Sequence, residues 1–388
     1  DMNREVYLDN IATTRPYDEV IDYISEINRN MYGNPSSLHS KGIESEKLIK
    51  KARSAIAESI SADPSEIIFT SGGTESNNLA IRGYLSANKR KGSHIITSKI
   101  EHPSVLEVFK HMEENGYRVD YINVDRYGNL DTEELKEKIS DETALVSILY
   151  VNNESGAIQP IEEISGIIKS ANKNTVFHVD AVQAYGKILI SPKKLGIDMM
   201  SLSSHKIHGP KGAGALYVEK SIKIKPIIFG GGQESLLRSG TENVTGICGF
   251  GLASEIIFKN IENNYKKVEL LRKTVIKELK SNFNDCIINS EDNSIPYILN
   301  VAFPYLKSEV LLHHLEEKGI YVSTGSACSS RKKVHSHVLK AMGLNSQQID
   351  GAIRISFSAM NKEEDIKELI QALKEIVPKI TIKSGGRR

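Results

Sequence analysis

Glu66-Ile67-Ile68-Phe69-Thr70-Ser71-Gly72-Gly73-Thr74 is the stretch that first indicates the fold. An apolar strand pattern ends at a glycine pair, and a helical pattern follows to about residue 88. Glycines at a helix start let an anion approach the backbone, and the helix N-terminus presents unpaired N–H groups to it. The stretch therefore suggests a phosphate site, although a capped helix start with turn glycines would look the same.

The same order of strand, loop and helix recurs outward from this stretch. Further strands are predicted at residues 94–98, 119–124, 145–151, 176–180 and 199–203. Continuous apolar runs of this length are typical of strands buried on both faces. We therefore predict an α/β fold, in which a large domain holds a mostly parallel, seven-stranded-type sheet between helices. Residues 214–218 follow after a turn too short for a parallel crossover, so this strand is expected to be antiparallel.

The pattern changes after about residue 260. A long charged helix at residues 262–282 leads to strands near 287, 297–302, 321–323 and 353–357, with a helix at 308–318. The last helix is expected to have Asn361 as its N-cap and Glu364 three residues on. We predict a large cofactor-binding domain at residues 16–260 and a smaller α+β domain formed by residues 1–15 and 261–388.

Composition narrows the functional classes. The chain has 388 residues, with 50 basic and 49 acidic side chains. Its charges therefore nearly balance and create no strong positive electrostatic field that would favour binding of nucleic acid. No apolar run reaches the roughly 20 residues of a membrane span, and the N-terminus lacks a signal-peptide pattern. Three cysteines argue against a disulfide scaffold and for a reducing cytoplasm.

Polar residues of complementary chemistry follow four predicted strands. Besides the loop at residues 70–78, these are His102, Asp180 and Lys206. Each has an ordinary explanation taken alone, as a structural histidine, a helix cap and a surface lysine. Ligands of open α/β sheets bind at the carboxyl ends of strands, so the four belong to one site. They suit an anion, a flat ring with a cationic nitrogen, and an aldehyde, and pyridoxal phosphate has all of these.

Several ordered motifs then resemble one family. They are Thr-Ser-Gly-Gly-Thr-Glu-Ser-Asn-Asn (70–78), Glu-His-Pro-Ser (101–104), Asn-Asn-Glu-Ser-Gly (152–156), His-Val-Asp-Ala-Val-Gln (178–183), Ser-His-Lys-Ile-His-Gly-Pro-Lys-Gly (204–212), Arg-Ser-Gly-Thr-Glu-Asn (238–243) and Ser-Thr-Gly-Ser-Ala-Cys-Ser-Ser (323–330). Together they resemble cysteine desulfurases of the NifS/IscS type, group I. These enzymes are class V aminotransferases with PLP fold type I. The similarity runs from residue 7 to residue 357.

The resemblance implies a role for each matching residue. Lys206 would hold the cofactor as a Schiff base, His102 would stack on its ring and move protons, and Asp180 would pair with the ring nitrogen. The remaining cofactor contacts would come from Gly73, Thr74, Gln183, Ser203 and His205, with Thr241 reaching the phosphate of a second subunit in a homodimer. Asn153 and Arg354, assisted by Asn34, would hold the carboxylate of L-cysteine.

Cys328 is the predicted sulfur carrier. It lies among small residues and precedes Arg331-Lys332-Lys333, whose charge favours a thiolate. The implied reaction converts L-cysteine to L-alanine and leaves a persulfide on Cys328. A sulfur-acceptor protein, either an iron–sulfur scaffold or a thiolation enzyme, would then take the sulfur. Residues 334–337 (Val-His-Ser-His) depart from the Glu-Pro-Ser of relatives, so the choice of acceptor stays open.

Three alternatives stay open at this stage. A selenocysteine lyase shares the fold and the first half of the mechanism. An ordinary class V aminotransferase would not need Cys328. A non-catalytic scaffold would not need Lys206, Asp180 or His102. His205 and His208 have no nearby cysteine or carboxylate set, so no catalytic metal is expected.

Overall fold

The computed structural model describes residues 4–89, 92–324 and 335–381. A seven-stranded sheet has the order β2-β8-β7-β6-β5-β3-β4. Its strands are β2 (Ile67–Thr70), β3 (His94–Ser98), β4 (Arg118–Ile122), β5 (Thr143–Leu149), β6 (Val176–Asp180), β7 (Met199–Ser203) and β8 (Gly214–Val218). Only β8 runs antiparallel to its neighbours in this sheet, as expected from the short turn before it. The predicted α/β class is confirmed.

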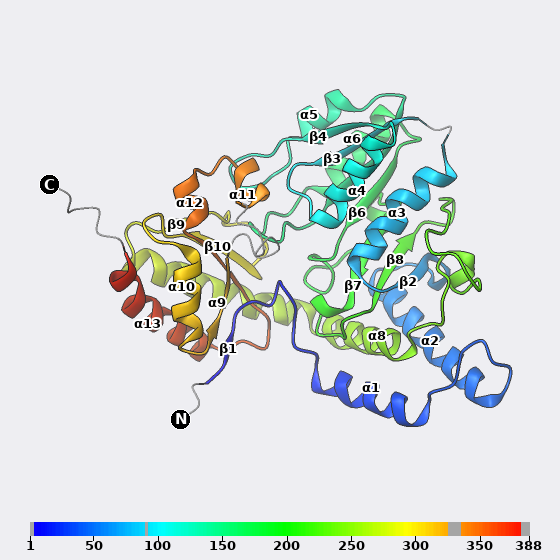
Figure 1. Ribbon diagram of the computed structural model, residues 1–388, viewed down its shortest axis with the longest axis horizontal. Helices are drawn as coiled ribbons and strands as arrows, with labels where there is room; N and C mark the ends of the chain where they lie inside the picture. Colours follow the sequence, from blue (N-terminus) through cyan, green and yellow to red (C-terminus); the bar gives the residue numbers. More distant parts are fainter. Residues whose placement is uncertain (1–3, 90–91, 325–334, 382–388) are drawn as a thin grey trace.

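Helices cover both faces of this sheet (Figure 1). Their bounds are α1 (Asp18–Asn30), α2 (Ser40–Ser59), α3 (Gly73–Ala87), α4 (Pro103–Glu114), α5 (Thr132–Lys138), α6 (Ile161–Ala171), α7 (Pro192–Leu195) and α8 (Val244–Lys259). Alternate strand residues enter two separate apolar clusters. Ile95 and Met199 pack with α3 and α4, whereas Ile96 and Met200 pack with α2, α6 and α8. Burial on both faces explains why the strands are continuous apolar runs.

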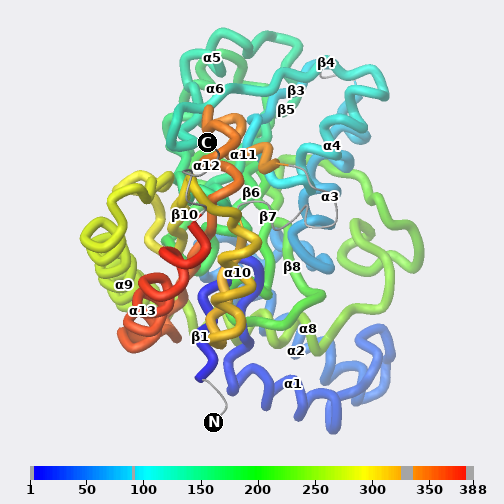
Figure 2. The backbone as a smooth tube through the Cα atoms, turned by 60° about the vertical axis from the view of Figure 1, so that its left-hand side comes forward, coloured from blue at the N-terminus to red at the C-terminus, as the bar shows by residue number. Residues whose placement is uncertain are grey.

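The C-terminal region builds a second, four-stranded sheet. Its order is β12-β13-β10-β9, and all its pairs are antiparallel. The elements are α9 (Ile261–Asn282), β9 (Ile287–Ile288), β10 (Ile298–Ala302), α10 (Ser308–Glu316), β11 (Ile320–Tyr321), β12 (Ser323–Thr324), α11 (His337–Ala341), α12 (Ser346–Asp350), β13 (Ala352–Ser356) and α13 (Glu363–Ile380). Near the N-terminus, β1 (Val6–Tyr7) pairs with β11 in parallel, so the N-terminal segment lies against the C-terminal region of the chain (Figure 2).

One apolar cluster runs through both sheets, from Ile56 and Phe177 to Ile353. The division of the chain at residues 260 and 261 falls between α8 and α9 and stays a prediction. Within residues 4–89, 92–324 and 335–381, no single helix is long and apolar enough to cross a membrane. The pair α8 and α9, bent by 72°, would pass that test only jointly and by length and composition alone.

Two local expectations are wrong. β4 and β5 begin at Arg118 and Thr143, one and two residues earlier than predicted, because both residues pair with His94 of β3. Both strands also end two residues earlier than predicted. The last helix is capped one residue later than expected, at Lys362. Asp365 rather than Glu364 accepts the Lys362 N–H, at 3.0 Å. Asn361 instead accepts from the Ser358 N–H and supports the turn before the helix.

Candidate active site

The carboxyl ends of β2, β6 and β7 converge on one cavity of about 310 Å³. Ten of the sequence-predicted residues line it, namely Gly73, Thr74, His102, Asn153, Asp180, Gln183, Ser203, His205, Lys206 and Arg354. They come from segments up to 281 positions apart in the chain, from Gly73 to Arg354. The rule about strand ends placed the loop at residues 70–78, His102, Asp180 and Lys206 at one site, and all of these features contribute to the cavity lining. The other residues were assigned from the resemblance.

The N-terminus of α3 forms one wall of the cavity. Gly73 and Thr74 open this helix, so their backbone N–H groups lie in the first turn, where no earlier helical carbonyl pairs with them. A Cβ atom on Gly73 would lie only 2.7 Å from Val182 Cγ2, so a side chain there would crowd the loop after β6. The glycine is thus required by close packing between two loops that both line the cavity.

Asp180 ends β6 with its carboxylate in the cavity wall. Its Oδ1 accepts the Val182 N–H at 3.0 Å, and its Oδ2 accepts from Asn77 Nδ2 at 2.9 Å. The side chain does cap the following turn, as the ordinary explanation required, but it lines the cavity as well. A carboxylate fixed by two donors in a largely buried site is suited to pair with a cationic ring nitrogen.

Asn77 connects Asp180 to His102. The same Nδ2 that donates to Asp180 also donates to Ser104 Oγ at 2.9 Å, and Ser104 Oγ lies 2.8 Å from His102 Nδ1. The Ser104 N–H donates to this Nδ1 at 3.1 Å, so Nδ1 is the acceptor and Nε2 carries the ring hydrogen. Sequence reasoning assigned no role to Asn77 or Ser104. Because Asn77 lies one turn after Thr74 on α3, its position could have indicated that its side chain faces the same site.

His102 is held as a neutral ring. Burial lowers its pKa, Asp180 raises it in opposition, and Lys206 and His337 lower it further. Burial likewise lowers the pKa of His205 to about 4, with added repulsion from Lys206, Lys211 and Lys187. Both histidines are therefore uncharged near neutral pH and available as donors or acceptors of a single proton.

Lys206 extends from the turn after β7 toward the N-terminal segment. Its Nζ donates to the carbonyl oxygens of Ile11 at 2.5 Å and Ala12 at 2.8 Å. No sequence pattern indicated these partners, because backbone carbonyls between β1 and α1 reach the site only through the tertiary fold. They fix the Lys206 amine in the wall of the cavity, which Asp180 and Gln183 also line.

Arg354 supplies the cavity with a guanidinium from β13 of the second sheet. Its Nη1 donates to the Asn153 carbonyl and its Nη2 to Asp9 Oδ1, both at 3.0 Å. The side chain is buried, and its Nε has no hydrogen-bond partner within the described part of the chain. Burial raises the pKa of Asp9, while Arg354 and Lys206 lower it. A buried guanidinium of this kind is suited to a carboxylate ligand.

Polar atoms in the cavity wall fit pyridoxal phosphate. Ser203 Oγ and Gln183 Oε1 are buried and, like Arg354 Nε, lack a hydrogen-bond partner among the residues the structure describes. Such groups in native proteins usually await a ligand or ordered water. Together with the helix start at Gly73 and the carboxylate of Asp180, they match a phosphate, a ring oxygen and a ring nitrogen. Lys206 would bond to the aldehyde carbon.

Two of the predicted site residues lie outside this cavity, and a third is not described by the structure. Asn34 and Thr241 are exposed and do not line this cavity. Cys328 lies outside the described residues. No group of three or more histidine, cysteine, aspartate or glutamate side chains in the described ranges is arranged to hold a metal. The other two cysteines are Cys248, which is buried, and Cys286, which is partly buried.

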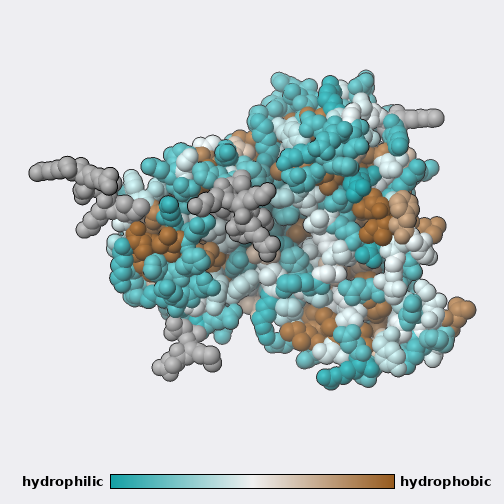
Figure 3. Space-filling model, in the orientation of Figure 1, coloured by the Kyte–Doolittle hydropathy of each residue, from teal (hydrophilic) through white to brown (hydrophobic). Residues whose placement is uncertain are grey.

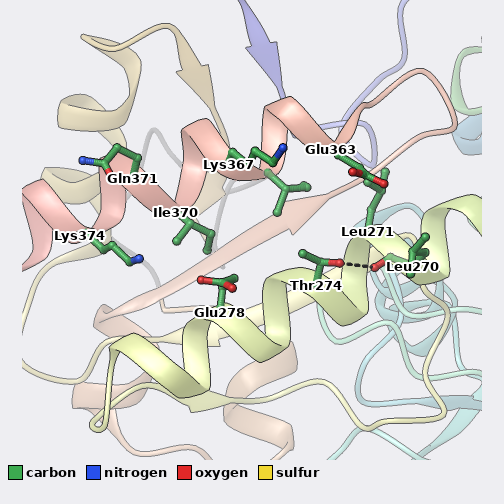
Figure 4. Close-up of a pocket in the computed structure, with 10 residues that line it drawn as sticks. Leu270, Leu271, Thr274, Glu278, Glu363, Lys367, Ile370, Gln371 and Lys374 are labelled. Atoms are coloured by element: carbon green, nitrogen blue, oxygen red, sulfur yellow. Dashed lines mark hydrogen bonds between the residues drawn. The ribbon is translucent and has the colours of Figure 1, made fainter.

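A larger cavity, of about 380 Å³, lies between α9 and α13 (Figure 4). Leucine and isoleucine side chains line it, including Leu271 and Ile370, and charged side chains such as Glu278 and Lys374 surround them. None of the predicted site residues lies there. The chemistry therefore belongs to the smaller cavity at the sheet edge.

Comparison with known proteins gives a consistent result. Residues 6–369 match the family model described as Aminotransferase class-V. The chain is 43% identical over 380 residues to a protein named cysteine desulfurase IscS from Dictyoglomus turgidum, covering 98% of this chain and 96% of that protein. It is 44% identical over 382 residues to a protein of the same name from Methanosarcina thermophila, covering 97% of this chain and 93% of the relative.

Solved structures agree with these relatives. A NifS-like protein superposes with a TM-score of 0.92 at 41% identity, covering 97% of this chain and all of that one. SspA in complex with cysteine superposes with a TM-score of 0.82 at 34% identity, covering 92% and 99%. The resemblance drawn from the motifs is confirmed: this chain belongs to the class-V aminotransferase family of pyridoxal-phosphate enzymes.

Proposed function

We propose that this protein is a cysteine desulfurase that converts L-cysteine to L-alanine and carries the sulfur as a persulfide on Cys328. One observation supports the proposal above all. Lys206, Asp180, His102 and Arg354 line a single cavity in a chain that is similar over nearly its whole length to proteins named cysteine desulfurase. Bound pyridoxal phosphate would supply an electron sink for the substrate's Cα carbanion.

Each of these residues then has a defined role. Arg354 binds the substrate carboxylate, and the Lys206 amine takes the Cα proton. The Nδ1 atom of His102 accepts from the Ser104 N–H, so the ring carries its hydrogen on Nε2. His102 therefore moves a proton at Nε2, on the other side of the ring. The Cys328 thiolate attacks the substrate sulfur, so an S–S bond forms as the C–S bond breaks. Cysteine plus enzyme thiol gives alanine plus enzyme persulfide, and no outside oxidant is needed.

The Cys328 thiol separates this proposal from its rivals. An aminotransferase needs a keto acid and no thiol, and selenium release needs the thiol less than sulfur transfer does. A non-catalytic scaffold would have no reason to keep Lys206, Asp180 and Arg354 around one cavity. We further propose that a sulfur-acceptor protein takes the persulfide in the cytoplasm, for iron–sulfur cluster assembly or for thiolation.

Arg354 offers a direct test of substrate binding. Arg354→Lys keeps the charge but loses the planar pair of donors, and a hydrogen bond to a charged group contributes about 1.5–3 kcal/mol. We expect the KM for L-cysteine to rise about 10- to 100-fold, with a smaller change in kcat, in steady-state assays of sulfide release. Arg272→Lys is the matched control. Arg272 is equally buried, and it donates hydrogen bonds to Glu291, Asp292 and Ser294 in the loop between β9 and β10, away from the cavity. An unchanged KM in Arg354→Lys would remove Arg354 from the substrate site.

We also propose that two copies of the chain assemble and share their sites. Asn34 and Thr241 lie outside their own cavity, and exposed apolar side chains flank both of them in sequence. Leu38 is 94% exposed and Phe229 is 82% exposed, and Tyr32 and Leu236 are also exposed. Contact between Arg53 of α2 and Glu234, at 2.7 Å, holds the segment around residue 234 against α2. Figure 3 shows hydrophobic side chains along the right-hand edge, where these loops lie.

This assembly predicts a mass of twice the chain's 43.0 kDa by light scattering. Phe229→Glu would place a charge in the apolar contact and should yield the single-chain mass, because burying an unpaired charge is unfavourable. Tyr305→Glu, at an exposed residue of the loop before α10, should leave the mass doubled. A single-chain mass for the unaltered protein would rule out the shared site.

A further inference from the structure

The short helix α11 packs against two loops that also carry residues of the candidate active site. Its side chains Val338 and Leu339 are buried in one apolar cluster with Ile100 and Leu149. Leu149 ends β5, and Ile100 lies in the loop between β3 and His102. The helix therefore lies against the edge of the large sheet where ligands are expected to bind, although it belongs to the C-terminal part of the chain.

Two hydrogen bonds fix the start of α11 on these loops. Ser336 Oγ donates to Glu154 Oε2 at 2.5 Å, and His337 Nε2 donates to the carbonyl oxygen of Glu101 at 2.8 Å. Ser336 Oγ also accepts the Leu339 N–H at 3.0 Å, which leaves its own hydrogen for Glu154. Ser336 and Glu154 are both buried, so loss of either partner would leave the other unpaired away from water.

The two receiving residues are neighbours in sequence of residues that line the cavity. Glu154 directly follows Asn153, and Glu101 directly precedes His102. Asn152 ties the two loops together, because its Oδ1 accepts the Glu154 N–H at 2.8 Å and its Nδ2 donates to the carbonyl just before Glu101 at 3.1 Å. The start of α11 is thus fixed to a part of the fold that also positions two cavity residues.

The chain on the other side of Cys328 is also fixed at the cavity. Ser323 and Thr324 form β12, which pairs with β13 so that Ser323 lies opposite Arg354. In the sequence, Cys328 follows Thr324 by four positions and precedes Ser336 by eight. The described residues that flank Cys328 therefore contact the fold at the guanidinium expected to bind the substrate on one side, and at the two glutamate-bearing loops on the other.

We propose that Glu154 is a positioning residue for sulfur transfer, which through Ser336 fixes one side of the segment that carries Cys328 at the substrate site. The bond from His337 to the Glu101 carbonyl acts in the same way. The inference rests on the proposed function in taking Cys328 as the sulfur acceptor. Glu154 itself does not line the cavity among the residues that the structure describes, so it acts through Ser336 and not on the substrate.

Sulfur transfer is the step that depends on this positioning. The Cys328 thiolate must reach the substrate sulfur for an S–S bond to form as the C–S bond breaks. The electron pair of the broken bond stays with the substrate carbon, which takes a proton to become the methyl group of alanine. Binding of the substrate carboxylate by Arg354 needs no thiol, so it should not depend on Glu154.

Two variants each remove one of the hydrogen bonds while nearly keeping the side-chain volume, Glu154→Met and His337→Phe. In single-turnover reactions of the loaded protein with L-cysteine, each should form alanine about tenfold more slowly, because small misplacements of a reacting group are costly. L-alanine has the carboxylate but no sulfur. Its Kd, read from the visible spectrum, should stay within about twofold of the unaltered value.

A conservative variant and a matched control complete the set. Glu154→Gln keeps an acceptor oxygen for Ser336, so it should form alanine at nearly the unaltered rate. Asn345→Ala removes the N-cap of the next helix, α12, where exposed Asn345 accepts the Gln348 N–H at 3.0 Å. It also costs a helix cap in this region but leaves both hydrogen bonds of α11 in place, so its rate should not change.

Hydrogen exchange of the cofactor-free chain measures the contact without any activity. Loss of the acceptor frees the start of α11 to open more often, so its amides, including that of Leu339, should exchange about fivefold faster in Glu154→Met than in the unaltered protein. Glu154→Gln should exchange at the unaltered rate. Equal exchange in Glu154→Met and the unaltered protein would show that Glu154 does not fix α11, and would overturn the inference.

The outcomes separate this inference from the proposed function. Slower alanine formation with an unchanged Kd for L-alanine, in Glu154→Met and His337→Phe but not in Glu154→Gln or Asn345→Ala, supports the positioning role. An unchanged rate in the first two variants overturns the role and leaves the desulfurase proposal intact, as does an equal loss of L-alanine affinity. If Glu154→Met does not fold, His337→Phe decides the matter alone. Absence of alanine formation by the unaltered protein overturns the proposed function itself, and this inference with it.

Discussion

Lys206→Ala should abolish covalent binding of pyridoxal phosphate and lower the rate of alanine formation by about 100- to 10,000-fold. The amine has two tasks, since it bonds to the cofactor and removes the Cα proton, and a positioned general base alone contributes about that factor. Its Nζ is held by the carbonyls of Ile11 and Ala12, and among the residues that the structure describes no other lysine lines the cavity.

The measurement combines the visible absorption spectrum with single-turnover alanine formation. Lys211→Ala is the control, because Lys211 lies five residues away in the same turn region but does not line the cavity. Its spectrum and rate should match those of the unaltered protein. Addition of a small primary amine should restore part of the rate in Lys206→Ala, because it replaces the missing base. Retention of full activity by Lys206→Ala would show that another group performs both tasks.

Cys328→Ala should stop sulfur transfer while leaving the cofactor spectrum unchanged. The thiolate attacks the substrate sulfur, so without it neither alanine nor sulfide should form above background. Arg331, Lys332 and Lys333 follow closely in sequence and favour the thiolate. Mass spectrometry of the unaltered protein after exposure to L-cysteine should find one added sulfur atom on the peptide that contains Cys328.

Cys286→Ala provides the control, because Cys286 is a partly buried cysteine in the loop before β9, and burial raises its pKa. Its activity should be unchanged. Full activity in Cys328→Ala would contradict the persulfide role and favour lyase or transaminase chemistry. Added sulfur on Cys286 instead of Cys328 would contradict the assignment of the carrier.

The sheet and much of the site follow from local sequence patterns. Apolar runs such as residues 176–180 identify strands buried on both faces, and a polar residue at the end of such a run, as in Asp180, lies at the sheet edge where ligands bind. The motif resemblance then assigned residues such as Gln183 and Arg354, which periodicity alone could not place. Asp180 lines the cavity because its place depends on one segment and one topological rule, whereas Gln183 and Arg354 line it at positions that only the resemblance indicated.

What the sequence did not reveal depends on contacts between distant segments. The carbonyls of Ile11 and Ala12 reach Lys206 across 195 and 194 positions of chain. Lys187 is 4% exposed and its Nζ lies 5.9 Å from the centroid of the Tyr297 ring, a burial that no local sequence pattern indicates. The N-cap of α13 is Lys362 rather than the predicted Asn361, because Asp365 and not Glu364 accepts the N–H of the cap residue. Which of two neighbouring carboxylates accepts such an N–H depends on the three-dimensional geometry of the helix start.

The most direct test of the central claim measures alanine and sulfide together. The unaltered protein, loaded with pyridoxal phosphate, is given L-cysteine and a thiol reductant, and both products are quantified over time. The account predicts equal amounts of alanine and sulfide from the unaltered protein and neither from Cys328→Ala. Pyruvate in place of alanine, or alanine from Cys328→Ala at the unaltered rate, would contradict it.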